Sequence, residues 1–442
     1  MEYYSFIHFG INTINNVEWG KGSEDIAAFN PLKLDTDQWC RVLKESGSKG
    51  VIITAKHHDG FCLWATKETD HCVTNTPFKK DIVKMLSESC KRFDLKFGIY
   101  LSPWDRHEKT YGTDEYNDFY IRQLKELCLN YGEVFCFWFD GACGEGKNGK
   151  KQVYDWQRYY STIRELQPEA VISVCGPDVR WIGNEAGKVR ESEWSVIPFD
   201  KEKAEAVMEN SQQTDDGGKE VAEVSERDAD LGSRELLRNC KELVFKPAEA
   251  DVSINLGWFW HNNFYYLFKK KRTAKDLADI YFKTVGGNAT LLLNVPPNKD
   301  GLIDKREQKT LRKFTKLINE PFRNEIKDVT LSVVNDKLEE REYSKNDICS
   351  FYDDEYVLKA SFKNEQTVAA LVIREDLRFS QRIESFSVYA KVDGAYIEIG
   401  KGTVIGSKKI LFLEKAVKTK ELLFAVTGTR ENPVIRDIAF YN

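Results

Sequence analysis

An acidic residue at the end of an apolar stretch carries the strongest chemical signal in this 442-residue sequence. Residues 134–139 are all apolar, four of them aromatic, and Asp140 and Gly141 follow. This run predicts a buried parallel strand that ends at solvent, with Trp138 and Asp140 on the same side. An indole beside a carboxylate suits a sugar, because C–H faces pack on the ring and the carboxylate attacks or stabilises an oxocarbenium-like carbon. An aspartate that only caps the next loop is the alternative.

Histidines and aromatic residues follow the other predicted strands. In barrel enzymes the catalytic groups lie at the carboxyl ends of the strands, so these positions form one candidate site. The residues at or just beyond those ends are His8, His57, His58, Tyr100, Trp104, Asp140, Trp181, Glu185, Trp194, Trp258, Trp260 and Asn294. Each alone is more readily a core residue, but their presence at nearly every strand end indicates a ligand pocket.

Paired carboxylates are the chemistry that the remaining motifs favour. A zinc site is disfavoured, because the adjacent His57 and His58 are expected to face opposite ways in a strand and no H-x-H or H-E-x-x-H motif occurs. No G-x-S-x-G elbow and no Gly-rich phosphate loop follows a strand, so we expect neither a metal nor a cofactor. Asp140 then needs a second acid, and the candidates are Glu185, Glu191, Glu193 and Glu249.

Alternating strands and helices over the first 320 residues provide the framework for these side chains. Strands are predicted at residues 6–10, 50–58, 96–102, 134–139, 170–176, 193–197, 250–255 and 290–295, and helices at 35–48, 81–93, 113–131, 154–166, 233–243, 274–285 and 304–319. Asp304 and Glu307 predict a capping box on the last helix. The pattern matches a (β/α)8-like, TIM-type barrel, and the acidic stretch 199–232 is predicted to be a mobile loop near one face or a surface insertion.

Past residue 320 the hydrophobic pattern changes to a period of two. Strands are predicted at residues 329–334, 368–374, 385–392, 396–400, 409–413 and 422–426, with a turn at Asp393 and Gly394. No helical pattern interrupts them. The chain is therefore expected to fold as an α/β barrel over residues 1–320, followed by an all-β sandwich over residues 321–442.

Composition limits the partners and the compartment. The formal net charge is only −5 and neither sign dominates, so we expect no nucleic-acid partner and no membrane association. No apolar run is long enough to cross a bilayer and the start lacks an export signal, which predicts a soluble, cytoplasmic protein, or a secreted or periplasmic one if a leader was removed. The ten cysteines include no C-x-x-C pair and are expected to be buried thiols. Nothing predicts an oligomeric state.

Five motifs in order resemble the alpha-L-fucosidases of glycoside hydrolase family 29. They are His8-Phe9-Gly10, Lys56-His57-His58-Asp59-Gly60-Phe61, Gly98-Ile99-Tyr100-Leu101-Ser102, Trp138-Phe139-Asp140-Gly141 and Leu292-Leu293-Asn294-Val295-Pro296-Pro297. The resemblance implies an exo-acting, retaining hydrolase of fucosylated oligosaccharides or glycoconjugates, with Asp140 as the nucleophile that forms a covalent fucosyl-enzyme. The residues that would bind the substrate are His8, Glu18, Trp19, His57, His58, Trp64, Tyr100, Trp138, Trp181, Glu249 and Trp258.

The acid/base is assigned from a second resemblance. The segment 179–196, with its Gly183-Asn184-Glu185-Ala186-Gly187 turn, is similar to the subfamily that cleaves alpha-1,3/1,4-linked fucose from branched, Lewis-type glycans. This implies Glu185 as acid/base, with its pKa raised beside Trp181 and Trp194, and leaves Glu249 as the second choice. A broad-specificity fucosidase acting on aryl, alpha-1,2 or alpha-1,6 fucosides, a hydrolase of another sugar, and a non-catalytic glycan-binding protein remain alternatives. The sandwich resembles discoidin-like domains and is expected to serve in packing, with sugar binding as the alternative.

Overall fold

The computed structural model describes residues 1–199, 228–238, 240, 242–262, 271–335, 339–343, 349–350 and 357–442. Most of the acidic stretch for which we predicted a mobile loop or an insertion, residues 200–227, lies outside these ranges.

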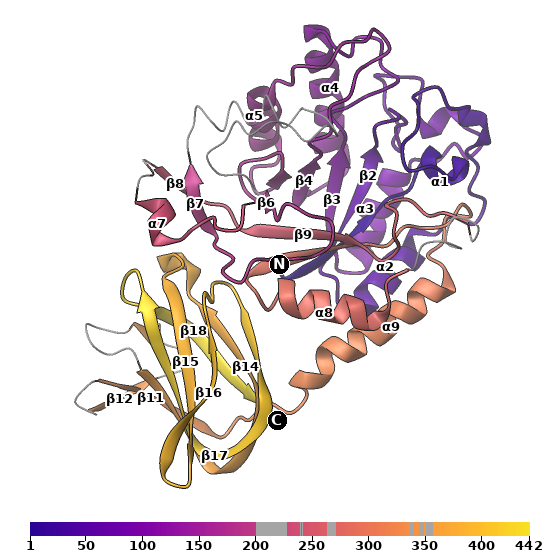
Figure 1. Ribbon diagram of the computed structural model, residues 1–442. Coiled ribbons are helices and arrows are strands. Elements are labelled where there is room, and N and C mark those ends of the chain that lie inside the picture. The colour runs from indigo at the N-terminus through magenta and orange to yellow at the C-terminus, as the bar shows by residue number, and fades with distance from the viewer. Residues whose placement is uncertain are drawn as a thin grey trace.

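Eight parallel strands form a nearly closed barrel, which confirms the predicted fold class (Figure 1). They are β1 (Tyr3–Ile7), β2 (Gly50–Lys56), β3 (Lys96–Leu101), β4 (Cys136–Phe139), β5 (Val171–Val174), β6 (Arg180–Trp181), β9 (Ala248–Ser253) and β10 (Ala289–Asn294), in the order β5-β4-β3-β2-β1-β10-β9-β6. The sheet closes where Val174 N donates to Val179 O at 3.0 Å, next to a single parallel bridge between Ser173 and Val179.

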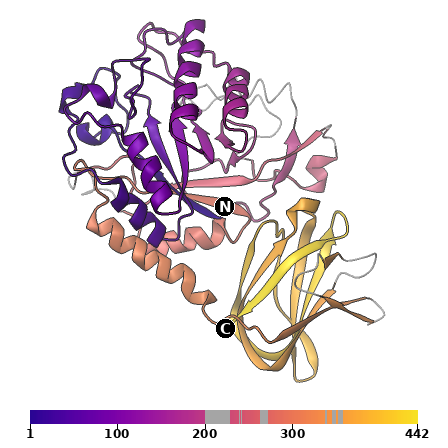
Figure 2. The same ribbon diagram turned by 180° about the vertical axis from the view of Figure 1, so that it is seen from behind.

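Helices surround the outer face of the barrel (Figures 1 and 2). They are α1 (Ile11–Asn15), α2 (Thr36–Glu45), α3 (Ile82–Arg92), α4 (Asp114–Asn130), α5 (Trp156–Leu166), α8 (Ala274–Thr284) and α9 (Lys305–Asn319). The short helix α7 (Arg234–Leu237) lies at the sandwich instead, where Arg234 pairs with Glu384. Asp35, Asp81 and Asp155 start α2, α3 and α5 by accepting a backbone N–H of the first turn. These local caps explain why most predicted helix starts lie within two residues of the observed ones.

The capping box predicted at Asp304 is wrong. Asp304 makes no side-chain cap on α9, because its carboxylate accepts from Trp260 Nε1 at 2.8 Å and from Asn298 Nδ2 at 2.6 Å. The capping box of this region lies one helix earlier, where Thr273 and Asp276 satisfy each other's backbone N–H groups at the start of α8.

The predicted sixth strand, residues 193–197, is also wrong. The sixth barrel strand is the two-residue β6, which pairs with β9, whereas β7 (Val196–Phe199) pairs antiparallel with β8 (Glu242–Phe245) in a separate ribbon. A two-residue strand is too short to show a periodic pattern, so the sequence favours the longer apolar run downstream as the sixth strand. The helix predicted at residues 233–243 is only the four-residue α7, since β8 begins at Glu242.

Two apolar layers lie on the two faces of the barrel sheet. One layer packs the outer face against the helices and includes all the odd-numbered residues of β2 from Val51 to Ala55. The other lies inside the barrel and consists of Tyr4, Phe6, Ile52, Tyr100, Phe135, Cys136, Trp138 and Leu292. Because Trp138 points inward, Asp140, two residues further along the chain, is directed to the inner end of the same barrel.

The C-terminal part is an antiparallel sandwich, as predicted (Figure 1). Its strands are β11 (Val329–Val334), β12 (Glu340–Tyr343), β13 (Cys349–Ser350), β14 (Val357–Glu375), β15 (Ile383–Val392), β16 (Ala395–Gly402), β17 (Lys409–Thr429) and β18 (Val434–Tyr441). The predicted strands 409–413 and 422–426 are parts of the single long strand β17. Its pairing with β14 shifts register twice, and such irregularities bend strands so that one sheet can fold over its own core. Asp393 and Gly394, both with positive φ, form the predicted turn between β15 and β16.

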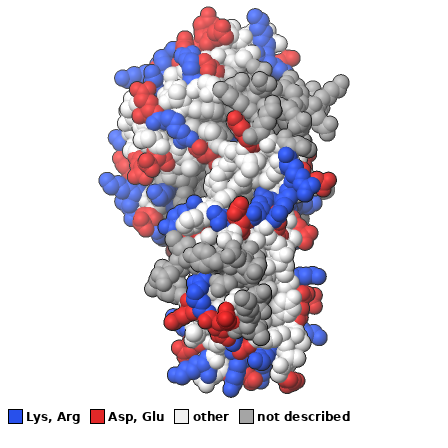
Figure 3. Space-filling model, turned by 90° about the vertical axis from the view of Figure 1, so that its left-hand side faces the viewer, with Lys and Arg blue, Asp and Glu red and all other residues white. Residues whose placement is uncertain are grey.

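The outer surface carries both signs of charge. Figure 3 shows Lys, Arg, Asp and Glu side chains interspersed over the barrel and the sandwich on the face in view. Among the described residues, no helix is both long enough and apolar enough to cross a bilayer. The side chains of nine cysteines are described, and all nine are free thiols, seven of them buried.

Candidate active site

Asp140 lies just past the end of β4 and is a partly exposed member of a polar cluster at the open end of the barrel. Its Oδ2 accepts from the Tyr100 hydroxyl at 3.0 Å and lies 3.9 Å from His58 Nε2. Its Oδ1 accepts from Ala142 N at 2.7 Å, which fixes the carboxylate to its own loop. The side chain remains 27% exposed, so one edge of the carboxylate faces the open end of the barrel.

The tautomer of His58 follows from its neighbours. The Ser102 hydroxyl donates to Trp104 O at 2.7 Å, so the Ser102 oxygen accepts from His58 Nδ1, also at 2.7 Å. Nδ1 therefore carries a proton, and Nε2 faces Asp140. This chain of contacts joins the end of β2 to the loop after β3 and orients the imidazole toward the carboxylate.

His8 and His57 are buried and neutral at physiological pH. Burial lowers the pKa of His8 to about 4, against the opposing effect of its hydrogen bond with Asn294, and burial next to other imidazoles lowers the pKa of His57 well below its ordinary value. Asn294 Oδ1 accepts from His8 Nδ1 at 2.9 Å, whereas Asn12 Nδ2 donates to His57 Nδ1 at 3.4 Å. His8 thus presents an acceptor nitrogen to the pocket and His57 a donor, a pair that matches the two hydrogen-bonding capacities of a sugar hydroxyl.

The expectation that His57 and His58 face opposite ways is wrong. Their ring centroids lie 4.0 Å apart at an interplanar angle of 39°. Strand β2 ends at Lys56, after a register shift against β3 between Thr54 and Lys56, so strand alternation no longer applies to the two histidines. Among the described residues, no group of three or more His, Cys, Asp or Glu side chains is placed to hold a metal ion.

Aromatic rings line the same space. Trp138 stacks on Tyr100 with centroids 5.4 Å apart, and Phe6 meets both rings edge-on. The ring centroids of Trp258 and His8 lie 5.1 Å apart, and Phe6 also meets Trp258 edge-on. Trp19, which is 42% exposed, meets His58 edge-on at 5.5 Å. Flat apolar surfaces therefore alternate with polar groups around the carboxylate, which is the lining that a sugar ring requires.

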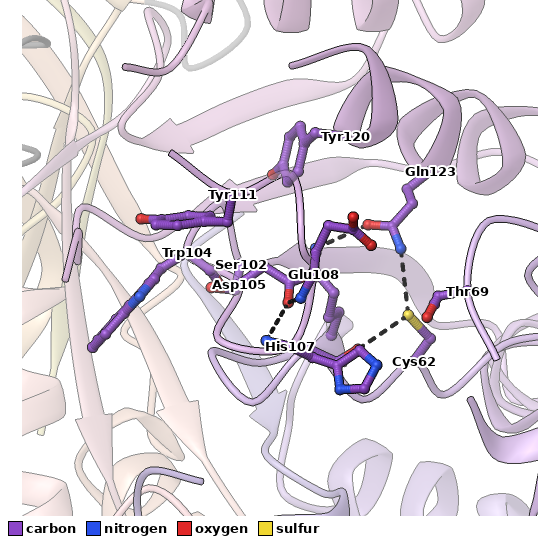
Figure 4. A network of polar contacts seen from close by, with 12 residues as sticks. Cys62, Thr69, Ser102, Trp104, Asp105, His107, Glu108, Tyr111, Tyr120 and Gln123 are labelled. Carbon is purple, nitrogen blue, oxygen red and sulfur yellow. Dashed lines mark hydrogen bonds and ion pairs between the residues drawn. The ribbon is translucent and has the colours of Figure 1, made fainter. Parts of the chain in front are cut away.

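A buried network supports the loop after β3 (Figure 4). Asp105 Oδ1 accepts from the backbone N–H groups of His107 and Glu108, both at 2.9 Å, and Oδ2 pairs with Lys56 Nζ at 2.9 Å. Gln123 on α4 also accepts from Lys56 at 2.9 Å. Burial alone would raise the pKa of Asp105, but Lys56 holds it below its ordinary value. Since Lys56 precedes the two histidines, this ion pair fixes their loop to the loop that carries Trp104.

Glu185 lies on a loop between β6 and β7 whose turn closes on itself. Asn184 Oδ1 accepts from Ala186 N and Lys188 N, and Gly187 takes a positive φ where it packs on Val252 and Ile280. Although the residue is exposed, its carboxyl group accepts a hydrogen bond from Trp258 and lies within the influence of the charged groups of Asp140, Glu18 and Arg272.

The pKa of Glu185 is raised. The causes are desolvation first, then the charges of Asp140 and Glu18, against the lowering effects of Trp258 and Arg272. We had expected apolar surroundings from Trp181 and Trp194. Trp194 instead packs against Gly232 and the Arg430 guanidinium, 3.6 Å from the ring centroid, so it belongs to the contact with the sandwich.

Asp251 is a site residue that sequence reasoning missed. It points inward from β9, is 4% exposed, and accepts from Trp181 Nε1 at 2.6 Å. Burial, with a further contribution from the Glu185 charge, raises its pKa to about 7. The available signal was a pair of acids two positions apart, Glu249 and Asp251, among small apolar residues; the predicted strand begins only at residue 250 and so leaves Glu249 outside it.

Glu249 lies below the pocket and not in it. It is fully buried on β9, where Oε1 accepts from Trp138 Nε1 at 2.7 Å and Oε2 bonds with the Tyr4 hydroxyl. Burial and the neighbouring Asp251 raise its pKa well above the ordinary value. The structure therefore places Glu249 at the Nε1 edge of the Trp138 ring, which it holds in position.

Two other predicted substrate contacts have different surroundings. Glu18 Oε2 accepts from Trp258 N at 2.9 Å and Oε1 contacts His261, so Glu18 lies at the pocket and holds the loop after β9. Trp64 is fully buried in the core between sheet and helices, with Nε1 donating to Glu126 at 2.9 Å. Of the predicted substrate-binding residues, the structure thus places all but Trp64 and Glu249 around the open end of the barrel.

The fold and this pocket define the class of the protein: a barrel glycoside hydrolase with carboxyl groups, neutral histidines and aromatic rings at the carboxyl ends of its strands. Residues 5–320 match the family model described as alpha-L-fucosidase. The chain belongs to the alpha-L-fucosidase family, glycoside hydrolase family 29, and is an alpha-L-fucosidase.

Relatives align along the whole chain. Alpha-L-fucosidase 1 of Arabidopsis thaliana is 36% identical over 456 residues, covering 99% of this chain and 84% of its own. A crystal structure of a putative alpha-L-fucosidase from Bacteroides ovatus has 41% identity and a TM-score of 0.86, covering 100% of this chain and 72% of that one. A family 29 fucosidase of Ruminococcus gnavus, solved in complex with fucose, has 28% identity and a TM-score of 0.80, covering 100% and 92%.

Proposed function

We propose that this fucosidase is an exo-acting, retaining enzyme in which Asp140 is the nucleophile and Glu185 the acid/base. The observation that carries the proposal is the contrast between the two carboxyl groups. Asp140 accepts hydrogen bonds from Tyr100 and Ala142, which stabilise a negative charge, whereas partial desolvation of the carboxyl group and the charge of Asp140 raise the pKa of Glu185 and favour its protonated form. A retaining glycosidase needs one carboxylate and one carboxylic acid in these roles.

In the first step, Asp140 attacks the anomeric carbon and the bond to the leaving oxygen breaks. Glu185 gives its proton to that oxygen, so the departing glycan leaves as an alcohol and a fucosyl-aspartate ester remains. In the second step, the ionised Glu185 takes a proton from a water molecule whose oxygen attacks the same carbon. The ester bond breaks, Asp140 regains its charge, and fucose leaves with its anomeric configuration retained.

Fucose recognition is proposed to rest on the neutral histidines and the rings. His8 and His57 offer one acceptor and one donor nitrogen to hydroxyl groups, and neither carries a charge that would have to be desolvated. Trp138, Tyr100 and Trp258 supply apolar faces for the ring and for the methyl group of a 6-deoxy sugar. The fucose complex of the Ruminococcus gnavus enzyme, which aligns over all of this chain, supports this substrate class.

The preferred linkage is proposed to be alpha-1,3 or alpha-1,4 fucose on branched glycans. The proposal rests on the Gly183-Asn184-Glu185-Ala186-Gly187 turn and on the exposed Trp19 beside the pocket, which could pack on a second branch. A fucosidase that also accepts aryl, alpha-1,2 and alpha-1,6 fucosides is the alternative. The division into a catalytic domain, residues 1–320, and a sandwich, residues 321–442, is likewise a proposal.

Two variants test the roles of the acids. Asp140→Ala should abolish turnover of an aryl alpha-L-fucoside while fucose still binds, and near-native turnover would remove Asp140 from the nucleophile role. Glu185→Ala should lose rate mainly on substrates with poor leaving groups, and azide should restore the rate. Glu191→Ala is the matched control, since Glu191 is also an acid on this loop, and it should retain the native dependence on the leaving group.

Initial rates on three substrates test the linkage. A branched Lewis-type trisaccharide, a 2′-fucosylated galactoside and an aryl alpha-L-fucoside are compared at equal concentration. Cleavage of the first with little reaction of the other two supports the narrow specificity. Equal or faster cleavage of the other two supports the broad alternative.

A further inference from the structure

The segment that follows the Glu185 loop is clamped between the barrel and the sandwich. Gln381, from the sandwich and only 2% exposed, accepts from Ser195 N at 2.7 Å and donates to Glu193 O at 3.3 Å. Asn288, between α8 and β10 of the barrel, donates to the same Glu193 O at 2.8 Å and to Gln381 Oε1 at 3.3 Å. Two buried amides, one from each domain, thus hold the same stretch of backbone.

Further contacts from the sandwich reach the same segment. Thr403 Oγ1 donates to Glu191 O at 2.8 Å. The Arg430 guanidinium covers Trp194 and contacts Gly232 O. Ser407 N donates to Asn288 Oδ1 at 2.7 Å, so the barrel amide of the clamp is itself held by the sandwich. Residues 191–195 are therefore held by contacts from the sandwich as well as by Asn288 and Arg180 of the barrel.

The clamp is connected to Glu185 by a short, internally fixed path. Arg190 N and the Arg190 guanidinium both contact the Glu193 carboxylate, which also pairs with Arg180 in β6. The self-closed turn of residues 184–188 precedes Arg190, and the one intervening residue, Val189, packs on an apolar cluster between β6, β9 and β10. A displacement of Glu193 would therefore also displace the turn, because these contacts fix the residues between them.

We propose that Gln381 is a positioning residue for the acid/base, through which the sandwich holds the Glu185 loop in its catalytic place. The inference rests on the proposed role of Glu185. Gln381 does not meet substrate or the reacting carbon; its effect passes through Glu193 and Arg190 to the turn. The sandwich is then a component of the catalytic machinery as well as a packing module. Misplacement of a catalytic group by about 1 Å can cost on the order of 100-fold in rate, so such support is large enough to measure.

The test compares the dependence of kcat/KM on the leaving group in a series of aryl alpha-L-fucosides with phenols from strong to weak acids. A strongly acidic phenol leaves as the phenolate and needs no proton, so only the weakly acidic phenols report on the acid/base. Gln381→Leu, similar in size but unable to make any of the three hydrogen bonds, should lower kcat/KM by about 10-fold to 100-fold on the poorest leaving groups, with little change on the best. Thr403→Val should give a smaller loss in the same direction and serves as the test if Gln381→Leu does not fold.

A matched control breaks a different contact between the domains. Glu2 pairs with Lys408 at 2.8 Å and with Arg374 at 3.8 Å, and neither contact touches residues 180–195. Glu2→Gln should leave the dependence on the leaving group unchanged. A similar change in Glu2→Gln would mean that any weakening of the domain contact has this effect, and would overturn the specific role of Gln381.

A double-mutant cycle with Glu185→Ala separates the two hypotheses. If Gln381 acts through Glu185, Gln381→Leu should have no further effect on poor leaving groups once Glu185 is absent. An equal loss on all substrates, or a loss that persists in the Glu185→Ala background, would overturn the inference and leave the proposed function intact. If Glu185→Ala lowers kcat/KM equally on good and poor leaving groups, the proposed acid/base role of Glu185 is wrong, whatever Gln381→Leu shows.

Discussion

Replacement of Glu249 distinguishes support of the pocket from acid/base catalysis. Glu249 is fully buried and holds Trp138 Nε1 with one oxygen and the Tyr4 hydroxyl with the other. Glu249→Leu removes the hydrogen-bond partner of both Trp138 and Tyr4 at nearly constant volume. Each buried polar group left without a partner costs about 1 to 3 kcal/mol, so the variant should lose about 2 to 6 kcal/mol in unfolding free energy.

Glu249→Gln is the matched variant. Because burial raises the pKa of Glu249 well above its ordinary value, the carboxyl is held in its protonated form, and an amide reproduces one acceptor oxygen and one donor. The amide oxygen can accept from Trp138 and the amide nitrogen can donate to Tyr4. The cost should be about 1 kcal/mol, near the net value of one hydrogen bond.

The sign of the pH dependence gives an independent check. The folded state keeps a proton on Glu249 that the unfolded chain loses, so the native protein loses stability as the pH rises above the ordinary carboxyl pKa. Glu249→Gln lacks this titration. Its stability relative to the native protein should therefore improve from acidic to neutral pH, as measured by the urea midpoint at several pH values.

Kinetics on an aryl alpha-L-fucoside and on a poorer leaving group complete the test. Glu249→Gln should keep kcat/KM within about tenfold on both, whereas Glu249→Leu should raise KM because the Trp138 ring loses its anchor. The reasoning is refuted if Glu249→Gln loses about 100-fold or more only on the poor leaving group and azide restores the rate, since that pattern belongs to an acid/base.

Three further outcomes follow from the geometry. Tyr100→Phe removes a hydrogen bond to the Asp140 carboxylate, worth about 1.5 to 3 kcal/mol, and should lower kcat/KM by roughly 10-fold to 100-fold with the fold intact by circular dichroism. Asp59→Asn should stabilise the protein as the pH rises from about 4 to 7, by up to roughly 4 kcal/mol in urea titrations, because burial raises the pKa of Asp59 to about 7 and the folded state must keep its proton. Arg272→Met removes a charge that lowers the pKa of Glu185, so the alkaline limb of the pH–rate profile should move to higher pH.

Each of these has a contrary outcome that is as easily seen. An unchanged kcat/KM in Tyr100→Phe would show that the hydrogen bond is not used in the transition state. A stability gain in Asp59→Asn that is the same at all pH values would exclude the proton linkage. An alkaline limb that stays in place in Arg272→Met would mean that Glu185 does not govern it.

Local patterns in the sequence predicted the rigid half of the site. Alternation along β4 places Trp138 and Asp140 on the inner face, and the helices predicted from residues 35 and 81 begin within one residue of α2 and α3, which Asp35 and Asp81 cap. These features depend on residues within a few positions of one another, which is why the sequence alone indicates them.

The remaining features depend on contacts that no local pattern contains. The two-residue β6 exists because β9 pairs with it, and Trp194 points to the sandwich because Arg430, more than 200 residues later, covers it. The shared orientation of His57 and His58 follows from the end of β2 at Lys56, whose ammonium is fixed by Asp105. Each of these outcomes is set by a distant partner, so the periodicity around the residue misleads.

The two proposed catalytic acids are held in place by different parts of the structure, so substitutions in those parts should affect them differently. Asp140 depends on Tyr100 in the neighbouring strand and on its own loop, contacts that survive changes elsewhere in the chain. Glu185 depends on a loop whose downstream end is held by Gln381. Substitutions at the domain contact should then alter proton transfer to the leaving group and leave attack by the nucleophile unchanged, whereas substitutions in the barrel interior should alter both.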